Sequence, residues 1–184
     1  MARTRQAISG RGRLNPQASP VVVTGPPLAG KWTLVRDAVR FCGGSTTTFQ
    51  YPLEDQPEMT ETGVRAELLL ESRPVRLMTF SGSIWDNEVW QPELRGAAAI
   101  VLVVDPQESR IEANQEAISW VTRVPRRSGC VIVSKCDLVG RAELRAVDRV
   151  LGVSAIADWP IVRKTSSLAL LEAIKKIWAF GHEL

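Results

Sequence analysis

Short apolar runs alternate along the chain with segments whose apolar residues recur at helical spacing. Residues 20–24, 97–104 and 130–133 are the clearest runs, and their apolar, largely β-branched composition predicts buried strands. A helical pattern follows each run, and a further one closes the chain. The residues with this spacing are Leu34, Val35, Ala38, Val39, Phe41, Ile111, Ala117, Ile118, Val121, Leu144, Val147, Leu151, Leu170, Leu171, Ile174, Ile177 and Trp178. This alternation predicts an α/β fold in which a mostly parallel sheet has helices on both faces.

The remaining segments add three strands and one long loop to this prediction. Residues 64–71 and 75–80 are typical of two strands joined by a short turn at residues 72–74, and residues 161–162 predict a last short strand. The sheet is therefore expected to contain about six strands. Residues 45–62 are polar and rich in threonine, lack a sustained period, and are interpreted as a long loop.

Length and composition indicate one domain preceded by a basic extension. A chain of 184 residues with 45% hydrophobic and 23% charged residues is ordinary for one globular domain, which we assign to residues 19–184. Residues 1–18 contain four arginines and no acidic residue. We expect a disordered tail there, although a transit peptide, a nucleic-acid arm and an attachment to an acidic partner have the same composition.

Membrane-spanning, secreted and metal-binding proteins have sequence signatures that this chain lacks. No apolar stretch approaches the roughly 20 residues that span a bilayer, and the tail has no apolar core of a secretory signal. The three cysteines and the single histidine form neither a disulfide framework nor a metal-ligand set. We therefore expect a cytoplasmic protein, and nucleic acid is not expected as its partner.

A glycine-rich segment directly after the first strand has the spacing of a phosphate-binding loop. Gly25, Gly30 and Lys31 match Gly-x-x-x-x-Gly-Lys, in which backbone N–H groups and a helix N-terminus surround phosphate oxygens while the lysine bridges them. The strand before the motif and the helix after it supply the required context. The backbone N–H of Trp32 can also contact phosphate, because that contact does not use the side chain. We expect the phosphates of a nucleotide to bind here.

The residue after the lysine departs from this motif. A Ser or Thr hydroxyl at that position usually ligates Mg²⁺, but Trp32 stands there and indole cannot ligate the ion. Thr33 comes one residue later, roughly 100° further around the helix, and would need a shifted backbone to offer its hydroxyl to the same ion. Thr33 is therefore a poor metal ligand, and the sequence argues against Mg²⁺.

A second motif follows the third apolar run. Ser134, Lys135 and Asp137 stand where guanine-binding P-loop proteins present Asn-Lys-x-Asp. Asp137 can accept hydrogen bonds from both N1–H and the exocyclic amine of guanine, while the stem of Lys135 packs over the ring. Ser134 lacks the two-armed amide of Asn, which predicts a weakened base site. Asp105 ends the preceding strand and is expected to cap the next helix, with contact to the nucleotide pocket as the alternative.

With these motifs in this order, the chain resembles the Ras superfamily after its tail, and in particular the bacterial gliding and polarity GTPases of the MglA type. Their Thr-x-Pro-Gly-Gln motif is matched at Thr79 and Gly82, but Ser83 replaces the glutamine. Because that glutamine orients the attacking water, its absence predicts slow or absent GTP hydrolysis. The resemblance implies a Ras-like P-loop fold, GTP or GDP as the ligand, and a roadblock-domain or motility-complex protein as the partner.

The resemblance also implies further site residues. Thr165 and Ser166 loosely match the Ser-Ala-Lys loop that supports the base, and Gly82 would lie on the phosphate side. Thr62, Thr79 and Ser83 are candidates in the two switch regions, through which such proteins bind partners.

We therefore expect a guanine-nucleotide-binding regulatory protein with little hydrolysis, acting through partner binding in cell polarity or motility. Two alternatives remain open. Trp32, Ser83 and Ser134 together also fit a pseudo-GTPase scaffold that does not usefully bind nucleotide. The local sequence Gly-Pro-Pro-x-Ala-Gly-Lys-x-Thr resembles nucleoside-monophosphate kinases, although the arginine-rich lid of those enzymes is not found.

Overall fold

Strands and helices alternate along most of the chain. The computed structural model describes residues 20–52, 60–80, 91–123, 128–154, 156–164 and 168–179. The elements are β1 (Val21–Thr24), α1 (Lys31–Cys42), β2 (Ser45–Pro52), β3 (Thr60–Leu70), β4 (Arg73–Phe80), α2 (Gln91–Gly96), β5 (Ala99–Val104), the short helix η3 (Glu108–Arg110), α3 (Ile111–Thr122), β6 (Ser128–Val133), the short helix η4 (Cys136–Leu138), α4 (Arg141–Gly152), β7 (Ile161–Arg163) and α5 (Ala169–Ala179). The tail predicted at residues 1–18 lies outside the described residues.

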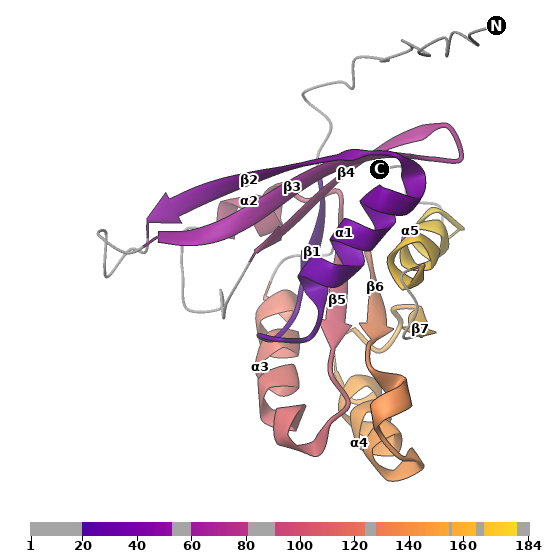
Figure 1. Cartoon of the computed structure of the whole chain (residues 1–184). Coiled ribbons are helices and arrows are strands. Elements are labelled where there is room, and N and C mark those ends of the chain that lie inside the picture. The colour runs from indigo at the N-terminus through magenta and orange to yellow at the C-terminus, as the bar shows by residue number, and fades with distance from the viewer. Residues whose placement is uncertain are drawn as a thin grey trace, which may run out of the picture.

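The strands form one sheet in the order β2-β3-β4-β1-β5-β6-β7. β1 pairs in parallel with both β4 and β5, and β5-β6 and β6-β7 are also parallel pairs. β2-β3 and β3-β4 are antiparallel, and together they form the ribbon that extends past the other strands in Figure 1. The prediction of a mostly parallel sheet with helices on both faces is confirmed, with seven strands where about six were expected.

The additional strand is β2, which corrects the interpretation of residues 45–62 as a loop. Ser45 lies opposite Glu67 and Pro52 opposite Thr60, so the whole strand is paired with β3. β2 is at the end of the sheet, and most of its side chains are exposed. An exposed edge strand needs no alternating apolar residues, which explains why the pattern of hydrophobic positions did not reveal it. Its run of β-branched threonines favours the extended backbone.

Two apolar layers enclose the sheet. On one face α1 and α5 pack against a core that includes Val21, Val23, Leu77 and Ile174. On the other face α2, α3 and α4 pack against residues of the opposite parity in the same strands. α1 crosses in front of the sheet in Figure 1. Because helices cover both faces, β1 and β5 are buried along their whole lengths, as expected for central strands of an α/β sheet.

The strand order brings three loops to one edge of the sheet. β1, β5 and β6 are parallel neighbours, so the segments that follow them emerge at the same edge. In open α/β sheets, ligands bind at the carboxyl ends of the strands. The phosphate-loop and base-loop candidates both lie at this edge. Among the described residues, no helix has the length and apolar character needed to cross a membrane.

Candidate functional site

The loop after β1 is a tight turn held close to β5. Gly25 has φ 146° and Gly30 has φ 92°, both in the region that favours glycine. A Cβ on Gly25 would lie 2.1 Å from the backbone oxygen of Val103 in β5, so only glycine fits there. The N–H of Ala29 donates to the backbone oxygen of Pro26 at 3.3 Å and closes the loop. The two predicted glycines therefore have a structural reason for their positions.

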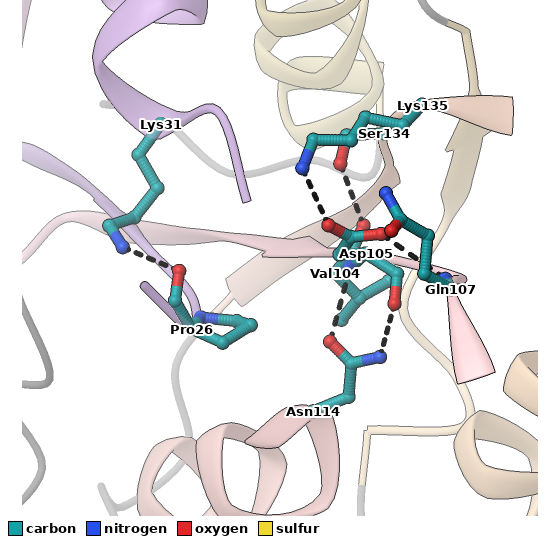
Figure 2. Close-up of polar contacts among 8 residues, drawn as sticks. All are labelled: Pro26, Lys31, Val104, Asp105, Gln107, Asn114, Ser134 and Lys135. Atoms are coloured by element: carbon teal, nitrogen blue, oxygen red, sulfur yellow. Dashed lines mark hydrogen bonds and ion pairs between the residues drawn. The ribbon is translucent and has the colours of Figure 1, made fainter. Parts of the chain in front are cut away.

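Lys31 begins α1 and turns its side chain back into this loop. Its Nζ donates to the backbone oxygens of Gly25 at 2.6 Å and Pro26 at 2.8 Å, and Figure 2 shows the second contact. The lysine is only 4% exposed. A positive charge therefore lies inside the loop and beside the N-terminus of a 12-residue helix. Both features attract anions, as expected for a phosphate site.

The next two positions on α1 differ from the lysine in burial. Trp32 is 38% exposed, and Thr33 is also exposed. Their backbone N–H groups belong to the first turn of the helix, where such groups have no partner within the helix. These N–H groups are suited to phosphate oxygens whatever the side chains are. Pro26 and Pro27 have no N–H, so after Gly25 the next backbone donor of this loop is Leu28.

The loop after β6 is bound to the end of β5. The backbone N–H and the Oγ of Ser134 both donate to the backbone oxygen of Val104, at 2.9 Å and 3.0 Å. Lys135 then adopts the left-handed conformation, with φ 50°. Its Nζ donates to Oδ2 of Asp105 at 2.7 Å, as Figure 2 shows. The base loop is therefore attached to β5 by a backbone contact and by an ion pair.

Asp105 is the buried centre of this cluster. Its side chain is completely buried, and its Oδ1 accepts the N–H of Gln107 at 3.2 Å. This second contact resembles the expected capping role, because it stabilises the turn that leads into η3. The ion pair with Lys135 connects the same carboxylate to the base loop. The cap residue of η3 is Gln107 and not Asp105, so the carboxylate supports the turn before the helix, and contact of Asp105 with a nucleotide stays a prediction.

Asn114 is a site residue that the sequence interpretation missed. It lies on α3 and is 2% exposed. Its Oδ1 accepts the backbone N–H of Asp105 at 3.1 Å, and its Nδ2 donates to the backbone oxygen of Asp105 at 2.6 Å. Asn114 shares the helical spacing of Ala117, Ile118 and Val121. A polar residue on that apolar face was the signal that could have identified it.

Asp137 and Cys136 lie in η4, directly after Lys135. Asp137 is exposed. The Sγ of Cys136 donates to the backbone oxygen of Val133 at 3.0 Å. Burial raises the pKa of the Cys136 thiol above its ordinary value, against an opposing effect from the charge of Arg163. This thiol therefore stays protonated near neutral pH and serves as a structural donor.

The threonine candidates have different environments. Thr62 lies within β3 opposite Gln50, inside the antiparallel ribbon. Thr79 lies in β4 opposite Val23 and is completely buried. Its Oγ1, like that of Thr24 at the end of β1, has no hydrogen-bond partner in the part of the chain that the structure describes. A buried hydroxyl without a partner destabilises the folded protein, and both hydroxyls lie beside the phosphate-loop candidate, where a ligand or water could accept from them.

The structure therefore brings two predicted groups of residues to one edge of the sheet. The phosphate group is Gly25, Gly30, Lys31, Trp32 and Thr33, and the base group is Ser134, Lys135 and Asp137. Four further candidates lie outside the described residues: Gly82, Ser83, Thr165 and Ser166.

Comparison with known proteins gives a limited result. No protein-family model matches the chain. Over 125 residues the chain is 26% identical to the GTPase Der of Deinococcus deserti, and the match covers 64% of this chain and 26% of that protein. The chain thus corresponds to about a quarter of the length of that relative. This similarity and the mostly parallel sheet with helices on both faces fit a P-loop GTPase.

Proposed function

We propose that this protein is a regulatory, GTPase-like protein that binds guanine nucleotide at the edge formed by the loops after β1 and β6. The observation that carries the proposal is the arrangement of two lysines in loops at the same edge of the sheet, on either side of the end of β5. Lys31 is buried inside a phosphate-type loop, and Lys135 is held to Asp105 next to Asp137. The similarity to a GTPase from Deinococcus deserti supports the same class.

The phosphates of the nucleotide would bind the loop before α1. The Lys31 ammonium, the first-turn N–H groups and the positive end of the α1 dipole all favour a polyanion. The loop is already folded around Lys31, since two backbone oxygens accept from its Nζ. A preformed loop requires little ordering when the ligand binds, which favours affinity.

The base would be recognised by the loop after β6. The exposed Asp137 carboxylate can accept two hydrogen bonds from guanine, whereas adenine offers no matching pair of donors. Lys135 lies two residues earlier in the chain, and its ammonium is fixed by Asp105 at 2.7 Å. Fixing the ammonium leaves the alkyl stem in a defined position for packing against a planar base.

Hydrolysis is proposed to be slow or absent. Ser83 replaces the glutamine that positions water in the related proteins, and a serine side chain is too short for that role. The regulatory part of the proposal, with binding of a roadblock-domain or motility-complex protein in cell polarity, rests on the resemblance to the MglA type. In single-turnover assays we expect GTP cleavage no faster than about 10⁻⁴ s⁻¹.

Base specificity is the most direct test of the proposal. Purified protein would be denatured to identify bound nucleotide, then stripped and titrated with fluorescent GDP and ADP. We expect GDP to bind at least tenfold more tightly than ADP. Asp137→Asn should weaken GDP and strengthen xanthosine diphosphate, because the amide can donate to the extra base oxygen. Equal affinities for GDP and ADP would contradict guanine recognition.

A matched control comes from the opposite edge of the sheet. Asp158 is exposed and precedes β7, so it lies at the amino ends of the parallel strands, away from both loops. Asp158→Asn removes the same charge as Asp137→Asn. It should leave the preference for GDP over ADP unchanged.

A scaffold without useful nucleotide binding is the second candidate function. The observation that favours it is the bonding of Lys31 to Gly25 and Pro26, because two of the three donors of the ammonium already have partners within the loop. Absence of binding to any nucleotide at hundreds of micromolar would select this candidate. Phosphoryl transfer from ATP to a nucleoside monophosphate would instead support the kinase alternative.

A further inference from the structure

The residues around the phosphate loop donate hydrogen bonds but offer few oxygens to a cation. Small GTPases hold their nucleotide with Mg²⁺, so the resemblance implies this ion. Mg²⁺ requires a near-octahedral set of oxygen ligands, usually including carboxylate or hydroxyl groups of the protein. The described residues around the loop do not supply such a set.

The first mismatch is on α1. Directly after Lys31, where a hydroxyl would reach the ion, Trp32 presents an indole that has an N–H donor and no available lone pair. Its side chain is 38% exposed, so it stands at the surface of the site. Thr33 is exposed at the next helical position, roughly 100° around the helix from Trp32.

A second feature is on β4, where the group that faces the site is a neutral hydroxyl and not a carboxylate. Thr79 follows the same parity as Val75 and Leu77, which belong to the apolar layer beneath α1. Its side chain therefore lies on the α1 side of the sheet, near the carboxyl end of the strand. The neutral hydroxyl is completely buried and has no partner among the described residues. This hydroxyl can donate to a phosphate oxygen or to water, and its oxygen can face a cation, but it adds none of the negative charge that a carboxylate would supply.

Among the residues that the structure describes, the one buried carboxylate is already engaged. Asp105 directly follows β5, and its two oxygens accept from Lys135 and from the N–H of Gln107. Recruiting Asp105 to a metal ion would break a buried ion pair. The described site thus has one buried ammonium, several N–H donors and the buried hydroxyls of Thr24 and Thr79, a set rich in donors to anionic oxygens and without an available buried carboxylate.

We infer that this loop binds guanine nucleotide without Mg²⁺, and that it binds the diphosphate at least as tightly as the triphosphate. The inference rests on the proposed function. A third phosphate adds negative charge that the Lys31 ammonium and the helix dipole must offset without a metal ion. Occupancy by nucleotide, rather than the presence of a third phosphate, would then be the signal that a partner detects.

The test measures the dissociation constants of nucleotide-free full-length protein for GDP and for a non-hydrolysable GTP analogue. Each titration is done in excess EDTA and again in millimolar Mg²⁺. We expect Mg²⁺ to change the GDP constant by less than about threefold, and GTP to bind no more tightly than GDP in EDTA. Tightening by Mg²⁺ of tenfold or more would overturn the inference. Absence of binding under both conditions would instead reject the proposed function.

A pair of variants tests the role of the indole. Trp32→Ser restores a hydroxyl after Lys31, and we expect Mg²⁺ to tighten GDP binding to this variant at least fivefold. Phe41→Ser is the control, because Phe41 is a 68% exposed aromatic residue at the other end of α1. Phe41→Ser should respond to Mg²⁺ as the wild type does. If Trp32→Ser also responds to Mg²⁺ as the wild type does, the indole does not exclude the ion, and the role inferred for Trp32 is wrong. Circular dichroism of both variants checks that they are folded.

Discussion

At the phosphate loop the side chain of Lys31 bonds to backbone oxygens, whereas at the base loop the side chain of Lys135 bonds to a buried carboxylate. The first loop is shaped by main-chain geometry, with glycine required at Gly25 because β5 passes 2.1 Å from where a Cβ would lie. The second is shaped by side chains, since Asp105 and Asn114 hold it to β5 and α3.

The difference indicates which substitutions each loop tolerates. A loop held by its backbone can accept an unusual side chain such as Trp32 without losing its shape, because the N–H groups keep their positions. A loop held by a buried ion pair depends on the chemistry of both partners. The predictions below separate these two kinds of support, beginning with the largest expected effect.

Gly25→Ala should be the most damaging single substitution. The added methyl group would overlap the Val103 oxygen, and φ 146° is unfavourable for any residue with a Cβ. We expect a loss of about 3 kcal/mol or more in unfolding free energy, together with loss of nucleotide binding. Urea denaturation measures the first effect. Gly152→Ala, at a position with open space at the end of α4, should change stability by less than about 0.5 kcal/mol.

Lys135→Met should lower the unfolding free energy almost as much, because it leaves the completely buried Asp105 carboxylate without its cation. We expect a loss of about 3 kcal/mol, and Asp105→Asn should restore part of it in the double variant. A double-mutant cycle in urea gives the coupling energy. Lys164→Met breaks an exposed pair with Glu172 and should cost less than about 1 kcal/mol. Equal losses for the two lysine variants would contradict a special role of burial.

Asn114→Ala tests the two hydrogen bonds from the Asn114 side chain to the backbone of Asp105, and its effect on stability should be smaller. The variant loses two hydrogen bonds to the backbone of Asp105, and we expect a cost of about 2 kcal/mol. Guanine affinity should fall with it, because Asp105 positions Lys135. Gln115→Ala, at the exposed neighbouring position, is the control. A loss of stability without any change in GDP affinity would show that these hydrogen bonds do not influence the base loop.

The buried thiol of Cys130 should make the unfolding free energy depend on pH in alkaline solution. Burial raises the pKa of this thiol from 9.0 to about 12, with the charge of Lys176 opposing the effect. The unfolded chain loses the proton first, so the stability associated with the neutral thiol is present below about pH 9 and is lost as the pH rises toward 12. Relative to Cys130→Ala, the wild type should lose at most about 1.4 kcal/mol per pH unit in this window. Parallel curves for the two proteins from pH 8 to 11 would refute the prediction.

Much of the fold and part of the site were predictable from local patterns. The buried strands β1, β5 and β6 are continuous apolar runs, and α1, α3, α4 and α5 follow their helical spacing. The tight glycine turn between β1 and α1 was predictable because its glycines, its lysine, the strand before it and the helix after it are contiguous in the sequence, and phosphate binding there stays a prediction. β2 was not predictable in this way, because an exposed edge strand rich in threonine has no apolar face.

The sequence by itself determined the alternation of strands and helices, the loop around Lys31 and the position of the base motif, because each depends on residues that are neighbours in the chain. Only the tertiary structure decided that Lys135 pairs with Asp105, 30 residues away, and that Asn114 brackets Asp105 from α3. The first contact depends on β5 lying beside β6. The second depends on α3 packing against the sheet face that α2 and α4 also cover. Strand order and packing are set by the burial of the whole sheet, which no short segment of sequence specifies.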